Sequence, residues 1–201
     1  MCGRYYADDE MAKAIEKLIS QTEGKLRREA MDAVDMLSAR DIHPSDTAPV
    51  LAEWEGSLCC QWQRWGFPGF KGKQVIFNAR SESVMEKPLF RDSVRHRRVV
   101  VPAASFYEWN ARKEKSTFYK EGQPVLFMAG FYGRYEDGNR FVILTTAANA
   151  SMKPVHDRMP LLLERDEVAG WVLDDGRIEN ILRKIPCLLE RRTEYEQLTL
   201  F

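Results

Sequence analysis

The chain has 201 residues, of which 44% are hydrophobic and 30% are charged, and this balance is typical of one folded domain rather than of a disordered or fibrous chain. No stretch reaches the roughly 20 uncharged apolar residues of a membrane span, and carboxylates occupy the start where a secretory signal is apolar, so we expect one cytoplasmic domain over residues 1–201. Thirty basic residues balance thirty acidic ones, so the chain lacks the excess positive charge of a protein that coats nucleic acid without sequence preference. The segment from Arg64 to Lys120, however, holds 13 basic and 5 acidic residues and can either attract an anion or form a solvated face.

The N-terminal part of the chain predicts two helices. Asp8 can cap the first, whose apolar residues Met11, Ile15, Leu18 and Ile19 fall on one face. A similar spacing of apolar residues predicts a second, surface helix over 25–37.

The middle of the chain predicts short strands. Leu58, Cys60 and Trp62 alternate with polar residues, and further strands are expected at 98–102, 105–109, 125–132, 141–146 and 159–163, with a hairpin turn at 136–139. Two helices, at 165–173 and 177–184, follow, with Trp171 buried. Because no strand–helix–strand rhythm is present, we predict an α+β fold with a curved, barrel-like, mainly antiparallel sheet and flanking helices.

Cysteine and histidine usage argues against a metal site. The four cysteines, at 2, 59, 60 and 187, form no CxxC pair, so thiols are expected rather than disulfides. The three histidines lie far apart, and His43 and His96 are expected at the surface. We therefore expect neither a metal nor a cofactor.

Cys2 has unusual chemistry if it becomes the first residue. Cysteine is small enough for the initiator methionine to be removed, which leaves an amine and a thiol on neighbouring carbons. Such a 1,2-aminothiol condenses with an aldehyde to a Schiff base and closes to a five-membered thiazolidine. The simpler interpretation is a chain end where any small residue serves.

Glu108 is a candidate for proton transfer. In a strand over 105–109, Glu108 shares a face with Phe106, whereas Tyr107 and Trp109 share the other. Apolar neighbours disfavour the ionised carboxylate, which suits a general acid or base, although a pair with a nearby arginine explains the residue equally well.

Polar loop positions supply further candidates. His156 precedes an expected strand and can exchange protons near neutral pH, with Arg158 as an anion contact. Asn78 can donate and accept hydrogen bonds, and Arg80 can bind phosphate, although capping or surface roles are common for both. Among the tryptophans, Trp62 is expected in the core and Trp65 on a loop where a base can stack.

The ordered motifs resemble one family. They are MCGR at 1–4, WGFP at 65–68, NARSE at 78–82, PAASFYEW at 102–109, AG at 129–130, TTAAN at 145–149 and HDRMP at 156–160. Each motif alone is modest, but their order over nearly the whole chain resembles the SOS-response-associated peptidase (SRAP) family.

This resemblance implies a sensor of abasic sites in single-stranded DNA that crosslinks itself to the lesion. Cys2 would be the nucleophile that forms the thiazolidine, Asn78 would hold the sugar, and Glu108 and His156 would move protons. Arg4, Arg80 and Arg158 match phosphate contacts, and Trp65 and Trp109 match the base-facing surface. The resemblance further implies self-removal of the residue before Cys2, a monomer without membrane contact, and binding at single-strand or junction DNA near the nucleoid.

Two other functions remain open from the sequence. One is a thiol peptidase that uses Cys2 and His156 on protein substrates. The other is a noncatalytic module that binds single-stranded DNA.

Overall fold

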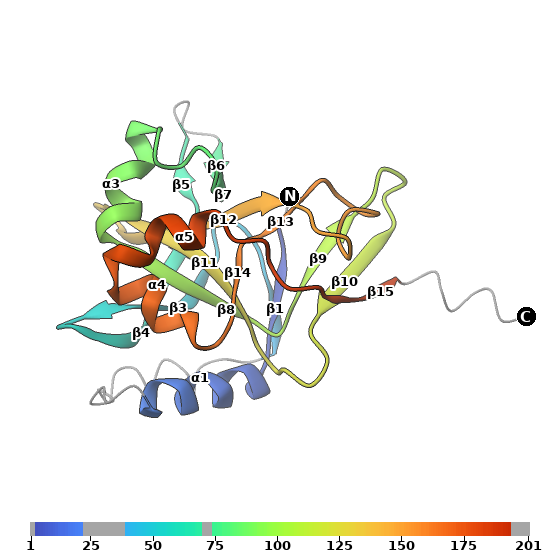
Figure 1. The fold of residues 1–201 in the computed structure, drawn as a ribbon, viewed down its shortest axis with the longest axis horizontal. Coiled ribbons are helices and arrows are strands. Elements are labelled where there is room, and N and C mark those ends of the chain that lie inside the picture. The colour runs from blue at the N-terminus through green and yellow to red at the C-terminus, as the bar shows by residue number, and fades with distance from the viewer. Residues whose placement is uncertain (1–2, 22–38, 70–73, 194–201) are drawn as a thin grey trace, which may run out of the picture.

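The structure is a computed structural model that describes residues 3–21, 39–69 and 74–193. The helix expected over 25–37 lies outside these ranges. Five strands close into a barrel in which each pairs with the next and the last pairs with the first (Figure 1). In barrel order they are β12 (Gly138–Ala147), β4 (Ser57–Trp65), β3 (Thr47–Trp54), β8 (Arg98–Ala103) and β11 (Leu126–Tyr135). With its flanking helices, this barrel confirms the predicted α+β class.

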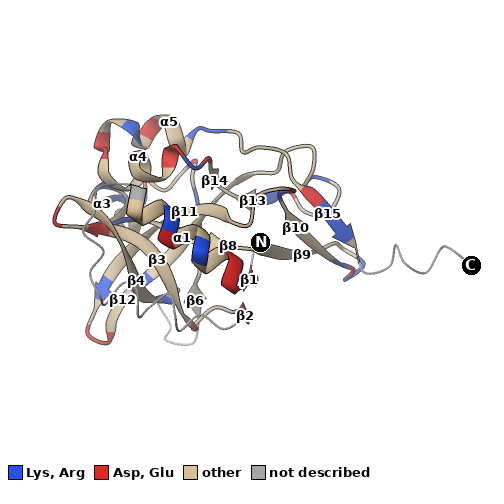
Figure 2. Cartoon of the chain, turned by 90° about the horizontal axis from the view of Figure 1, so that it is seen from below, with Lys and Arg blue, Asp and Glu red and all other residues tan. Residues whose placement is uncertain are grey.

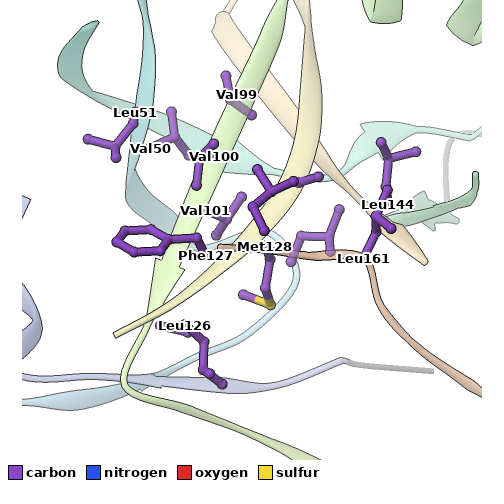
Figure 3. Packing of buried hydrophobic residues seen from close by; sticks show 14 of the residues in the cluster. Val50, Leu51, Val99, Val100, Val101, Leu126, Phe127, Met128, Leu144 and Leu161 are labelled. Carbon is purple, nitrogen blue, oxygen red and sulfur yellow. The ribbon is translucent and has the colours of Figure 1, made fainter. Parts of the chain in front are cut away.

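The core of the barrel is built from β-branched and other aliphatic side chains. Figure 3 shows Val50 and Leu51 of β3 packed near Val99, Val100 and Val101 of β8, with β11 side chains beside them. All six residues of β8 are buried, because both of its faces are covered. Helices α1 (Asp9–Gln21), α3 (Pro88–His96) and α4 (Glu167–Leu173) each contact this strand from outside the barrel.

Helix α1 begins and packs as its sequence predicts. The carboxylate of Asp8 accepts a hydrogen bond of 2.8 Å from the backbone N–H of Met11, which satisfies one donor of the first turn. Met11, Ile15 and Ile19 are buried along one face. Amphipathic spacing and the cap therefore confirm the first predicted helix.

A second sheet of five strands stands beside the barrel. Its order is β15 (Glu190–Thr193), β10 (Lys115–Tyr119), β9 (Ser105–Trp109), β1 (Tyr5–Ala7) and β2 (Arg40–Ile42). Strand β9 has the bounds that its sequence predicts. The chain passes from β8 of the barrel to β9 through Ala104, whose N–H donates to the carbonyl of Tyr6 at 2.8 Å.

The remaining elements are short. They are β5 (Phe67–Pro68), β6 (Val75–Ile76), β7 (Asn78–Arg80), β13 (Arg158–Pro160), β14 (Leu162–Leu163), the 3-10 turn Asp175–Arg177 and α5 (Ile178–Leu182). The predicted strand over 159–163 is therefore two short strands on different partners, since β13 pairs with β12 and β14 pairs with β11.

The predicted hairpin and the predicted buried tryptophan are both confirmed. Tyr135 of β11 pairs with Gly138 of β12, and the turn between these two residues joins the strands. Gly138 adopts φ +112°, a conformation that glycine tolerates. Trp171 is fully buried, and its indole N–H lies within hydrogen-bond distance of the carbonyls of Val99 and Gly130. This tryptophan ties α4 to the barrel wall.

Arg98 is a buried cation that joins two helix ends. Its guanidinium donates to the carbonyls of Val94 at the end of α3 and of Trp171 at the end of α4, and it pairs with Asp175 at 2.6 Å. Carbonyls at helix C-termini carry partial negative charge, so a cation is favourable there. The sequence predicts Arg98 at the start of a strand, and its side chain is only 3% exposed.

Charged residues of both signs occupy the outer elements. Figure 2 shows residues of both signs on α1. Within α4 and α5 the charged residues are acidic, Glu167 and Glu179. Within the described ranges, none of the helices has the length and apolar character to span a bilayer.

Candidate functional site

Two of the predicted site motifs meet at the end of β12. Strand β7 pairs with one edge of β12, with Arg80 opposite Thr145, and β13 pairs with it so that Arg158 lies opposite Ala147. Figure 1 shows β7, β13 and the start of β1 at the same end of the molecule, opposite α1. The topology therefore brings segments 78–80 and 156–158 together, although they are far apart in the chain.

Asn78 and Arg80 share the same side of β7. Asn78 is half-buried and Arg80 is exposed. Both line a cavity of about 620 Å³ between β6–β7 and the start of α3. Arg80 makes no ion pair with any residue that the structure describes, so its guanidinium is available to an anion.

Glu108 occupies the predicted face of β9. It is 3% exposed and lies on the same side as Phe106, which stacks on Phe118 with ring centroids 5.3 Å apart. Residues of β9 alternate between half-buried and buried, as the sequence predicts. A carboxylate in such surroundings is shielded from water, which suits exchange of a proton with a ligand.

The first described residues are held against β9. The backbone N–H of Tyr107 donates to the carbonyl of Arg4 at 3.1 Å. The Arg4 guanidinium lies 5.2 Å from the ring centroid of Trp109 and 3.7 Å from the Asp41 carboxylate. Arg4 is thus fixed over the outer face of β9 by a cation–π contact and an ion pair. Cys2 itself lies outside the described residues.

The outer face of β9 combines aromatic rings with cations. Lys115 of the neighbouring strand lies 4.4 Å from the ring centroid of Tyr107, whose ring is 6.5 Å from that of Trp109. Partial burial and a hydrogen bond to Asp41 raise the pKa of Tyr107 to about 12, so its phenol remains neutral at physiological pH. Rings and cations of this kind suit the bases and phosphates of a single strand.

His156 has a partner for each of its charge states. Its Nδ1 accepts a hydrogen bond of 2.9 Å from the backbone N–H of Arg158, which requires a lone pair, so the proton of the neutral ring lies on Nε2. The same Nδ1 lies 2.8 Å from the Asp157 carboxylate, a contact that is favourable when Nδ1 is protonated. One nitrogen cannot make both interactions at once, because acceptance needs a lone pair and donation needs a proton.

Arg158 is held in a polar cluster at the base of the site. Two of its nitrogens donate to the Glu82 carboxylate at 2.7 and 2.8 Å, and one also donates to the carbonyl of Thr145 at 2.7 Å. The Arg158 hydrogen bonds lower the pKa of Glu82. The Arg158 side chain is only 12% exposed. Its main role in this structure is to link β13 to the segment after β7, and little of its surface is open to a phosphate.

The prediction that Trp65 forms a loop platform for bases is wrong. Trp65 ends β4 and is fully buried, its indole N–H donates to the carbonyl of Phe77 at 2.9 Å, and its ring packs parallel to that of Phe141. A ring without exposed surface cannot stack on a base. Trp62, expected in the core, is only partly buried, because the inward face at this end of β4 carries Gln63 and Trp65.

Glu82 and Asn149 also hold the site together, although no role was predicted for either of them. Glu82 belongs to the same motif as Asn78, and its place in that motif is the only indication in the sequence that it contributes to the site. Asn149 donates to the carbonyls of Pro186 and Cys187, and its side-chain oxygen accepts from the N–H of Ser151. Asparagine after a strand is typical of such turns, and this one positions the loop that leads to His156.

The described cysteines are free thiols, as predicted. Burial raises the pKa of Cys60 to about 12, and burial also raises the pKa of Cys187. Thiols of this kind are poor nucleophiles at neutral pH. Over the part of the chain that the structure describes, no three His, Cys, Asp or Glu side chains gather into a metal-binding group.

Comparisons with known proteins agree with these motifs. The family model of the SOS response associated peptidase (SRAP) matches residues 1–197. The abasic site processing protein YoaM of Bacillus subtilis is 35% identical over 123 residues, which are 54% of each chain, so the match spans about half the length of that relative. The abasic site processing protein YedK of Escherichia coli is 25% identical over 181 residues, which cover 86% of this chain and 79% of that protein.

Solved structures share the fold. A protein from Bacteroides thetaiotaomicron superposes with a TM-score of 0.78 at 20% identity, over 96% of this chain and 91% of that one. A phage-related protein from Bordetella bronchiseptica gives a TM-score of 0.75 at 20% identity, over 96% and 94%. These likenesses concern the fold alone. The family match over residues 1–197 shows that this chain belongs to the SOS response associated peptidase (SRAP) family.

Proposed function

We propose that this protein processes abasic sites in single-stranded DNA by forming a covalent thiazolidine through Cys2 after removal of Met1. Relatives named abasic site processing proteins support the substrate class. The exposed Arg80 and the Arg4–Trp109 contact support a nucleic-acid strand as the ligand. The adduct would shield the sugar aldehyde from elimination and so protect the strand from breakage.

The backbone hydrogen bond between Tyr107 and Arg4 is the observation that carries this proposal. It holds Arg4 next to the strand that bears Glu108. Two residues extend by at most about 7 Å, so a nucleophile at position 2 would have the Glu108 side of β9 within reach. An internal cysteine lacks the neighbouring amine that the reaction needs.

The reaction needs proton transfers that Glu108 and His156 can divide. A base removes a proton from the terminal ammonium, and an acid donates one as the closed sugar opens to its aldehyde. The amine adds to the aldehyde carbon, and loss of water gives the imine. The thiol sulfur then adds to the imine carbon, its proton passes to nitrogen, and the five-membered ring closes. Asn78, on β7, would hold the sugar hydroxyls.

Arginines would hold the phosphates on either side of the lesion. Arg80 is exposed and Arg4 lies over Trp109, so both can contact a strand that crosses the end of the barrel. Arg158 is engaged by Glu82, and we propose that it acts mainly by positioning the segment that carries His156.

The decisive experiment mixes the protein with single-stranded DNA that contains one abasic site. We expect an adduct that survives denaturation and carries the mass of protein without Met1 plus DNA, less one water. Cys2→Ala should form none, whereas Cys59→Ala should react like the wild type. Absence of any adduct from protein with a free Cys2 amine would overturn the proposal.

Two further readouts separate the other functions. Cleavage of unrelated peptides with turnover would indicate a thiol peptidase. Equal affinity for abasic and intact strands, unchanged by Cys2→Ala, would indicate a binding module. We propose that the protein itself removes Met1. Mass spectrometry of Glu108→Gln and His156→Asn proteins tests this, and we expect either variant to retain Met1.

A further inference from the structure

A cavity beside Asn78 is lined by Asn78 and Arg80 and by further residues that the proposed chemistry does not use. Its volume is about 620 Å³, within the usual range of small-molecule sites. It lies between β6–β7 and the first turn of α3. Among the described lining residues are Ile76, Asn78, Arg80, Lys87, Pro88 and Leu89.

The described part of the lining is apolar with two cations. Ile76, Pro88 and Leu89 supply apolar surface, and Leu89 remains 42% exposed, which is high for a large aliphatic side chain beside a polar site. The Lys87 ammonium lies 5.9 Å from the ring centroid of Phe90. Arg80 is the second cation, and no Asp or Glu is among the described residues that line the cavity.

An apolar pocket beside unopposed cations is complementary to a nucleotide. The base would occupy the apolar surface, and the phosphates would meet Arg80 and Lys87. Because Asn78 lines the same cavity, an occupant lies next to the position proposed for the lesion sugar. A base that adjoins an abasic site has already lost one stacking neighbour, so moving it out of the stack costs less than it does in intact DNA.

We propose that this cavity receives the unstacked base of a nucleotide that adjoins the lesion. The inference rests on the proposed function and deepens it, since it gives the protein a preference for what flanks the abasic site. Recognition is by apolar contact, so a purine, which buries more surface than a pyrimidine, binds better. Leu89 is a specificity-determining residue in this scheme.

The experiment varies the neighbour of a single abasic site. Oligonucleotides carry a purine, a pyrimidine or a base-free tetrahydrofuran, which has no aldehyde, on the 5′ or the 3′ side. Initial rates of adduct formation are measured below saturation. At one of the two sides, we expect the base-free neighbour to lower the rate by about fivefold or more, with purine faster than pyrimidine.

Variants at exposed leucines connect the preference to the cavity. Leu89→Gln should remove the dependence on the neighbour, whereas Leu89→Met should keep it. Leu173→Gln on α4 is the matched control, because Leu173 is 40% exposed and lies outside the cavity, and it should behave like the wild type. Circular dichroism confirms that each variant is folded.

The outcomes separate this inference from the proposed function. Adducts that form equally fast with every neighbour overturn the inference and leave the proposed function standing. A preference that persists in folded Leu89→Gln also overturns it. No adduct with any oligonucleotide overturns the proposed function and the inference together.

Discussion

Arg158 and Glu82 lie 76 residues apart in the chain and form a bidentate ion pair, with nitrogen–oxygen distances of 2.7 and 2.8 Å. The pair joins β13 to the segment that follows β7. It therefore fixes the two motifs that carry His156 and Asn78 relative to each other.

The Arg158–Glu82 pair should make stability depend on pH in the acidic range. Arg158 hydrogen bonds lower the Glu82 pKa in the folded state, while the unfolded chain keeps a value near 4.3. A lowered folded-state pKa contributes stability that is complete above the unfolded value and is lost as the pH falls through the folded value. Because Glu82 is half exposed, we expect Glu82→Gln to lower the free energy of unfolding by only about 1 kcal/mol at pH 7.

Urea denaturation of wild type and Glu82→Gln between pH 3 and pH 7 checks this. The difference in free energy of unfolding between the two proteins should shrink as the pH falls below about 4. A difference that stays constant over the whole range would show that the ion pair is not its source.

Glu108→Gln should separate chemistry from folding. The amide has nearly the same shape as the carboxylate but cannot exchange a proton, so adduct formation should slow by about 10²- to 10⁴-fold. Affinity for abasic DNA and the midpoint of unfolding should change little. Single-turnover kinetics and urea denaturation measure the two effects, and an unchanged rate would remove Glu108 from the reaction.

Arg80→Gln should alter the salt dependence of binding. Each phosphate contact to a single strand contributes about 0.7 to the slope of log K against log salt concentration, so the slope should become shallower by about this amount. Lys17→Gln, an exposed lysine on α1 at the opposite end of the molecule, is the charge-matched control and should keep the full slope. Fluorescence anisotropy at several salt concentrations distinguishes them.

Trp65→Ala should act on stability. The side chain is fully buried between Tyr5, Phe77 and Phe141, so removing it leaves a cavity and costs about 3–5 kcal/mol. Trp65→Phe keeps part of the packing but removes the hydrogen bond to Phe77, so it should lower the free energy of unfolding by less than Trp65→Ala does. A normal unfolding midpoint for Trp65→Ala with weakened DNA binding would contradict the buried role.

Arg98→Met should destabilise the protein by about 2–4 kcal/mol. The substitution leaves several buried carbonyls of α3 and α4 without their donor. Asp175→Asn should cost far less, because Asp175 is 74% exposed. Guanidinium unfolding of both variants provides the comparison, and equal losses would argue against the helix-end role.

Local patterns were enough to predict much of the fold. The Asp8 cap, the alternation along β9 and the hairpin before Gly138 depend on neighbours in the sequence, and all three are confirmed. Helix α3 was not predicted, since Pro88 and the basic residues after it resemble a solvated loop. Its burial against β11 and β8 is a tertiary effect.

The site was only partly accessible from sequence. Motif order indicated Asn78, Glu108 and His156. The pairing of both β7 and β13 with β12 explains how the segments that carry Asn78 and His156 come to the same end of the barrel. Trp65 was misjudged, and the burial of Arg98 was not predicted, for one reason. Whether a side chain is covered depends on which elements pack over it, and neither periodicity nor charge reveals that.

Buried Arg98 also links one wall of the cavity beside Asn78 to a distant part of the chain. Helix α3 is anchored by its last turn to α4, while its first turn forms one wall of the cavity beside Asn78. Tilting of this helix would move Leu89 relative to Arg80 without any change in the residues that line the cavity. If the cavity acts as proposed, substitutions in the C-terminal helices would change which flanking base is preferred while every residue that lines the cavity stays the same.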